Sequence, residues 1–87
     1  MVELFEGDSS LIAKGSYDLI VANINRNIIL KDMELYAKGL KRDGVLILSG
    51  FYAYDNKMVV EEANKYNLSL IGVMEKDGWS AIKFLNK

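Results

Sequence analysis

The chain has 87 residues, a net charge of −1, and neither cysteine nor histidine. This composition excludes zinc and iron–sulfur sites, thiol catalysis and serine–histidine triads, so any chemistry must come from carboxylates, amides, hydroxyls, lysines or a bound cofactor. The length predicts a single domain, residues 1–87, whose stability is marginal unless the chain associates.

The charge pattern gives no sign of a nucleic-acid or membrane partner. The densest basic group, Lys38, Lys41 and Arg42, falls at a predicted helix end, where it either complements the helix dipole or contacts phosphate. No apolar run approaches the ~20 residues that span a bilayer, and the first residues lack the basic start of a signal peptide. We therefore expect a soluble, cytoplasmic protein without direct membrane or nucleic-acid binding.

The first part of the chain contains two predicted strands and a helix. Val2 to Phe5 is expected to be a short strand, and Tyr17 to Ile24 is an almost unbroken apolar run, typical of a parallel strand buried on both faces. A helix is predicted from Asn27 to a stop at residues 42–44, with Glu34 and Lys38 paired on its outer side. Its inward face is expected to carry Ile29, Met33, Tyr36, Ala37 and Leu40.

The second part is predicted to contain a strand, a helix and a hairpin. Val45 to Gly50 is another continuous apolar run, and Asp55 is a candidate cap for a second helix. Leu68 to Met74 and Trp79 to Leu85 are two more strands, joined by a turn whose Asp77-Gly78 pair is typical of hairpins. The inward face of the second helix is expected to carry Val59, Val60, Ala63 and Tyr66.

The order of these elements predicts an α/β fold. Strands that alternate with helices form a mostly parallel sheet, here with helices on its faces and a terminal antiparallel hairpin. The last strand should therefore run antiparallel to the rest.

Two asparagines, Asn23 and Asn25, lie where the second strand ends. That edge of an open α/β sheet is where ligands bind. An amide there accepts a hydrogen bond from an amine and donates one to a carbonyl without changing charge, which favours a site that aligns a nitrogen nucleophile. The alternative is that both residues only end the strand and cap the next helix, where asparagine is preferred.

Taken together, the motifs resemble a known family of enzymes. Gly7-Asp8 precede the run Tyr17 to Ile24, Leu46 to Gly50 end the next strand with Leu-Ser-Gly, and Trp79 lies in the hairpin. This arrangement is similar to that of S-adenosylmethionine-dependent methyltransferases, above all the ribosomal protein L-eleven methyltransferase family. The resemblance covers nearly the whole chain and implies a Rossmann-like methyltransferase fold, present only as the carboxyl-terminal half of the catalytic domain.

The chain departs from the family pattern in two ways. It has Arg42 and Asp43 where the family often has proline and glycine, in a turn far from the expected site. It also contains no Gly-x-Gly loop for the cofactor and no substrate-recognition domain. We therefore expect a part of a longer protein that is inactive alone and meets its substrate through the missing amino-terminal domain.

The resemblance implies roles for individual residues. Gly7, Asp8 and Ser9 would lie along the adenine of the cofactor, although Asp8 or Ser9 could instead cap a helical turn over residues 10–14. Asn23 would contact the cofactor and, as the catalytic residue, align the attacking amine. The substrate would be contacted by Ile24, Asn25, Ser49 and Gly50.

Three aromatic residues follow the strand that ends at Gly50. Phe51, Tyr52 and Tyr54 either line the same pocket or belong to local core or to an interface.

The expected activity is transfer of methyl groups from S-adenosylmethionine to amino groups of a protein, a large-subunit ribosomal protein. Two alternatives remain open at this point. One is a methyltransferase of the same fold that acts on a small molecule or RNA, and the other is a non-catalytic α/β binding or assembly module.

The family's strand order also bears on association. In the family's sheet two further strands separate the one at Val2 to Phe5 from the one at Tyr17 to Ile24, so without them the second would present an exposed apolar edge. An unpaired edge of this kind invites association. We predict either that the first strand pairs directly beside the second or that the chain forms a homodimer through that edge.

Overall fold

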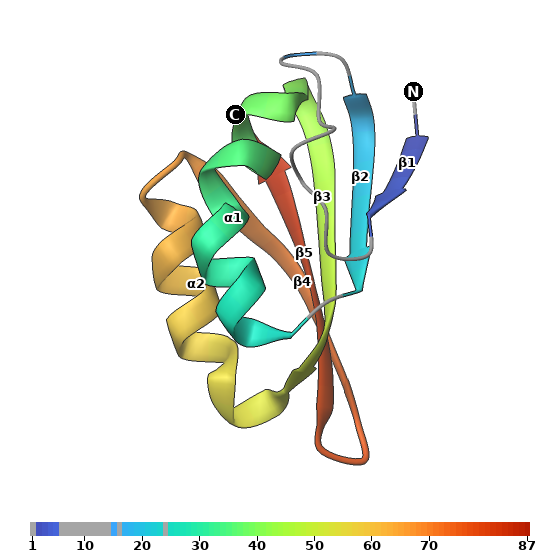
Figure 1. The fold of residues 1–87 in the computed structure, drawn as a ribbon, viewed down its shortest axis with the longest axis vertical. Helices are drawn as coiled ribbons and strands as arrows, with labels where there is room; N and C mark the ends of the chain where they lie inside the picture. The colour runs from blue at the N-terminus through green and yellow to red at the C-terminus, as the bar shows by residue number, and fades with distance from the viewer. Residues whose placement is uncertain (1, 6–14, 16, 24) are drawn as a thin grey trace.

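A computed structural model describes residues 2–5, 15, 17–23 and 25–87. In this part of the chain, a five-stranded sheet carries two α-helices, none of which has the length and apolar character needed to cross a membrane (Figure 1). The elements are β1 (Val2–Phe5), β2 (Tyr17–Asn23), α1 (Arg26–Gly39), β3 (Leu40–Tyr52), a short 3₁₀ helix (Ala53–Asp55), α2 (Asn56–Asn64), β4 (Leu68–Lys76) and β5 (Trp79–Asn86).

The sheet has the strand order β1-β2-β3-β5-β4. β1, β2 and β3 are parallel, and β5 runs antiparallel to both of its neighbours, as the sequence predicts. The turn between β4 and β5 has positive φ angles at Asp77 (52°) and Gly78 (82°), the conformation that favours an Asp-Gly pair in a two-residue hairpin. The predicted α/β fold with a terminal hairpin is confirmed.

The first strand pairs directly beside the second. In the parallel register, Val2 lies opposite Leu19 and Phe5 opposite Ala22. This confirms the first of the two arrangements predicted for this edge. β1 covers the edge of β2 through which the alternative homodimer would form, and association of the chain itself stays a prediction.

The core lies between the helices and one face of the sheet. Every second residue of the central strands points to this face, so these side chains are shielded from water. The helices contribute their predicted inward faces, except that Ala37, Val60 and Tyr66 are only partly buried against the core. The fully buried apolar residues of the sheet are Ile20, Ala22, Leu46, Leu48, Phe51, Leu68, Ile82 and Phe84, and those of the helices are Ile29, Met33, Tyr36, Val59 and Ala63.

The expectation that β2 and β3 are buried on both faces is wrong for the described structure. Leu19 and Val21 of β2, and Val45 and Ile47 of β3, alternate with the core residues and remain partly exposed. The physical reason is that α1 and α2 contact each other and therefore lie on the same face of the sheet, which Figure 1 shows.

The end of α1 also differs from the prediction. The helix ends at Gly39, before the expected stop at residues 42–44, and Leu40 already begins β3 while its backbone N–H donates to Tyr36 O. Residues 41–44 form an irregular segment within β3. Leu40 pairs with Tyr17 and Val45 pairs with Leu19, so β3 advances by five residues while β2 advances by only two.

Gly44 shows why this irregular segment is tight. A Cβ atom at Gly44 would lie 2.9 Å from the carbonyl oxygen of Lys41 and 3.2 Å from that of Asp18. Both contacts are with backbone atoms, which cannot move aside as a flexible side chain can. Only glycine allows the chain to approach β2 this closely.

Tyr36 provides a test of the core. Its hydroxyl is buried without a hydrogen-bond partner among the described residues, and burial, together with the charge of Asp32, raises the pKa of Tyr36 above its usual 10.0. Tyr36→Phe should raise the free energy of unfolding by about 1 kcal/mol, because it removes an unpaired buried polar group. Since the ionised phenol is disfavoured in the folded state, the wild type should lose stability as the pH rises through about 10, and the variant should lose less.

Urea unfolding followed by circular dichroism at about pH 7 and about pH 10.5 measures both effects. Tyr66→Phe, in a partly buried ring after α2, is the control at neutral pH and should leave the free energy of unfolding unchanged there. A Tyr36→Phe variant less stable than the wild type at neutral pH would show that the hydroxyl has a partner.

Candidate functional site

The carboxyl ends of β2 and β3 meet at one edge of the sheet. Asn23 is the last residue of β2 and lies opposite Ser49 of β3 in the parallel register. The next residue, Gly50, has a φ of 92° at an irregularity between Ser49 and Phe51. Glycine adopts this conformation without strain, and the irregularity turns the following residue, Phe51, into the core.

A cavity of about 560 Å³ lies beside these strand ends. Three residues predicted from the sequence, Asn23, Ser49 and Gly50, line it together. The rest of its wall comes from the hairpin, because β5 begins opposite the end of β3. These wall residues are Met74, Lys76, Trp79, Ser80 and Ala81.

The Asn23 side chain is suited to hold a ligand. It is exposed, and it makes no hydrogen bond to any residue in the part of the chain that the structure describes. Its amide oxygen is thus available to accept a hydrogen bond and its nitrogen to donate two. With half-buried Ser49 beside it, the cavity offers neutral polar groups on two adjacent strands.

The two asparagines have different environments. Asn25 is the N-cap of α1, where its Oδ1 accepts a hydrogen bond from the backbone N–H of Ile28 at 3.1 Å. It does not line the cavity of Asn23 but a second, smaller one of about 330 Å³. The capping interpretation therefore describes Asn25 and not Asn23. A contact between Asn25 and a substrate stays a prediction.

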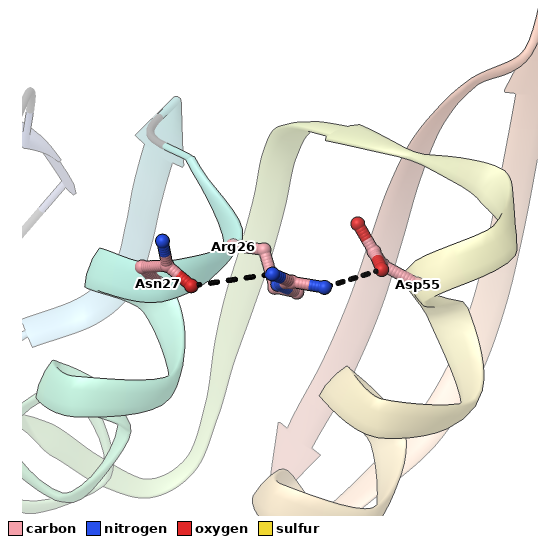
Figure 2. Close-up of polar contacts among 3 residues, drawn as sticks. All are labelled: Arg26, Asn27 and Asp55. Atoms are coloured by element: carbon pink, nitrogen blue, oxygen red, sulfur yellow. Dashed lines mark hydrogen bonds and ion pairs between the residues drawn. The ribbon is translucent and has the colours of Figure 1, made fainter.

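The second cavity contains an ion pair that joins the two helices. Arg26 at the start of α1 donates from Nη1 to Oδ1 of Asp55 at 3.1 Å and from Nη2 to Oδ1 of Asn27 at 3.4 Å (Figure 2). The Asp55 side chain is only 9% exposed, and a buried carboxylate needs a partner. Asp55 occupies the N-cap position of α2 as predicted, but its side chain makes no capping hydrogen bond, because the carboxylate binds Arg26 instead.

The three aromatic residues that follow Gly50 line the second cavity and not the first. Phe51 is also part of the buried core, and Tyr52 and Tyr54 are exposed. Tyr52 stacks on Tyr54, with centroids 5.2 Å apart and planes at 11°, and on Trp79, at 4.3 Å and 22°. Trp79 lines both cavities.

Sequence reasoning missed Trp79 as a site residue. The Asp77-Gly78 turn predicts how β4 and β5 pair with each other, and it places Trp79 at the start of β5. What the sequence did not reveal is that β5 pairs with β3, which places Trp79 opposite Tyr52.

Four predicted site residues lie outside the described residues. These are Gly7, Asp8 and Ser9 of the expected cofactor loop, and Ile24 after β2. Their roles stay predictions.

The sequence of the chain has clear relatives. The model of the family described as ribosomal protein L11 methyltransferase (PrmA) matches residues 2–87. The chain belongs to this family. Among its members, the ribosomal protein L11 methyltransferase of Bacteroides thetaiotaomicron is 43% identical over 84 residues, and that of Porphyromonas gingivalis is 44% identical over 79 residues. These alignments cover 95% and 90% of this chain but 30% and 27% of the relatives, so the chain spans less than a third of their length.

Solved structures show the same fold. A ribosomal protein L11 methylase from Lactobacillus delbrueckii subsp. bulgaricus superposes with a TM-score of 0.83 at 23% identity, covering 93% of this chain and 42% of that one. A TehB-like SAM-dependent methyltransferase from Corynebacterium glutamicum gives 0.68 at 19%, covering 93% and 54%. A 16S rRNA methyltransferase from T. thermophilus, in complex with AdoMet and guanosine, gives 0.68 at 15%, covering 91% and 22%. The fold is thus the Rossmann-like fold of methyltransferases.

Proposed function

We propose that this chain supplies the acceptor half of the active site of an S-adenosylmethionine-dependent methyltransferase, which modifies amino groups of ribosomal protein L11 in the cytoplasm. Membership of the PrmA family supports the reaction class and the substrate. The observation that carries the proposal is the Asn23 amide at the carboxyl edge, which has no hydrogen-bond partner among the described residues and lies beside Ser49 and Gly50 in one cavity.

The residues of the cavity fit an amine acceptor. The Asn23 oxygen accepts a hydrogen bond from an N–H of the amine, which orients the nitrogen lone pair. The wall from Met74, Trp79 and Ala81 is mostly apolar, which favours the neutral, nucleophilic form of a bound amine over its ammonium form. An amide is sufficient here, because the reaction needs alignment more than acid–base chemistry.

The cofactor would be held by Gly7, Asp8, Ser9 and Asn23. When bound, S-adenosylmethionine supplies an electrophilic methyl group on a sulfonium, which leaves as a neutral thioether. Among the described residues, only Asn23 belongs to this set, and the sequence has no Gly-x-Gly loop. We therefore expect the 87-residue chain alone to be inactive.

A chimera tests the proposal. The segment of this chain that aligns with the Bacteroides thetaiotaomicron relative would replace the corresponding region of that protein, and transfer of labelled methyl groups from S-adenosylmethionine to purified ribosomal protein L11 would be measured. We expect labelled L11 with the chimera, and none with the relative truncated before that region or with this chain alone. A folded, monodisperse chimera that labels no L11 would refute the proposal.

A further inference from the structure

Three exposed aromatic rings form one continuous surface next to the candidate site. Tyr54, Tyr52 and Trp79 stack in this order, and we call them the aromatic ladder. They are 79%, 42% and 48% exposed, and none belongs to the buried core. Single exposed aromatic residues are common, but three in contact form an apolar patch of the kind that marks an interaction site.

The ladder leads away from the candidate acceptor cavity. Trp79 lines that cavity together with Asn23, and Tyr52 lies opposite Trp79 in the antiparallel register. Tyr54 ends the stack, and its 79% exposure leaves it open to a partner. A polypeptide whose side chain enters the cavity would therefore pass over the other rings.

The charges around the ladder favour a basic protein segment over nucleic acid. The Arg26 guanidinium is held by Asp55, and Lys76 is flanked along the chain by Glu75 and Asp77. No cluster of cations among the described residues here could neutralise a phosphate backbone, which dominates nucleic-acid affinity. Aromatic faces, in contrast, attract ammonium and guanidinium groups directly.

We propose that the aromatic ladder is the docking surface for a basic, lysine-bearing segment of the substrate protein that flanks the methyl-accepting amine. This inference rests on the proposed function for the identity of the substrate. The ladder binds the segment by stacking and cation–π contacts on the outer face of Tyr54. Tyr52 lies between the rings of Tyr54 and Trp79 and supports them, and Trp79 forms the boundary with the acceptor cavity.

The single tryptophan makes binding directly measurable. Trp79 is the only tryptophan in the chain, so its indole N–H gives one signal in a proton–nitrogen correlation spectrum of the labelled 87-residue chain. Titration with purified ribosomal protein L11 should shift this signal. Tyr54→Ala should raise the Kd about threefold to fivefold, the range expected for an exposed cation–π contact. Tyr54→Phe keeps the ring and should keep the wild-type Kd.

Leu35→Ala is the matched control, because it removes an exposed apolar side chain on α1, away from the ladder, and should leave the Kd unchanged. Two results would overturn the proposal: no shift with L11, whether or not a twelve-nucleotide oligouridylate shifts the signal, or an equal Kd for Tyr54→Ala. A shift of the Trp79 signal with the concentration of the chain alone would also overturn it, because a second copy would then cover the ladder.

The chimera separates this proposal from the proposed function. There, Tyr54→Ala should raise the KM for L11 and leave kcat unchanged. A chimera that methylates L11 with the same KM in both forms refutes only the docking surface. Conversely, ladder-dependent binding of L11 without any methyl transfer refutes only the proposed reaction.

Discussion

Replacing Asn23 by Ala in the chimera is expected to lower kcat for L11 methylation about 10²- to 10³-fold, the usual loss for one orienting polar group in an active site. The free energy of unfolding should change by less than about 0.5 kcal/mol, as for other exposed positions. The reason is that the Asn23 side chain is exposed and has no hydrogen-bond partner among the described residues, so the fold does not depend on it. Steady-state kinetics and urea unfolding measure the two quantities.

Asn25→Ala is the control, because it removes the same amide two residues along the chain. It should lower the free energy of unfolding by about 1 kcal/mol, since the N-cap bond to Ile28 is lost. If Asn23→Ala also destabilised the protein by this amount and left kcat unchanged, Asn23 would be a structural residue. The non-catalytic binding module would then be the better interpretation.

Phe84→Ala is expected to cost about 3 to 5 kcal/mol, the largest loss of stability that we predict for a single substitution. Phe84 is fully buried on β5, where it faces the helices and lies opposite Leu46 of β3. Small domains have a free energy of unfolding of only about 5 kcal/mol, so this variant should be largely unfolded at room temperature. Circular dichroism and the dispersion of the amide signals report the loss.

Phe84→Leu should retain the fold with a smaller loss, because most of the apolar volume remains. Leu35→Ala, in a side chain 43% exposed on α1, should cost much less than Phe84→Ala. A folded Phe84→Ala variant with a cooperative transition near that of the wild type would show that the core lies elsewhere.

The parts of the fold that follow from local pattern could be predicted from the sequence. The apolar runs at residues 17–24 and 45–50 predict β2 and the central part of β3, and the Asp77-Gly78 pair predicts the hairpin, because each signal depends only on neighbouring residues. The ion pair between Glu34 and Lys38 also follows from helical spacing, and it is present at 2.7 Å.

The features that depend on tertiary contacts could not be predicted. Predicting that β3 starts at Leu40 would require two tertiary contacts: the pairing of Leu40 with Tyr17, and the close packing of Gly44 against backbone oxygens. The sequence allows two kinds of partner for the Asp55 carboxylate: the backbone N–H groups at the N-terminus of α2, or a cationic side chain far away in the sequence. Only the structure shows that Arg26 is within reach.

The candidate site was predicted only in part, because some of its residues follow from the predicted topology and others depend on strand pairing. Asn23, Ser49 and Gly50 end strands that are both parallel and adjacent, so their meeting at one edge follows from the topology. Trp79 reaches the same cavity only because β5 inserts between β3 and β4, a pairing that no local signal reveals.

This insertion of β5 has a consequence for the order of events in folding. β4 and β5 are joined by a two-residue turn and can pair within about 1 to 10 microseconds, whereas β3 and β5 must close a long loop to bring Val45 beside Leu85. We expect the hairpin to form early and to dock on β3 late. Because β5 provides one wall of the acceptor cavity, the ability to bind an amine should appear only at this last step, together with the completed sheet.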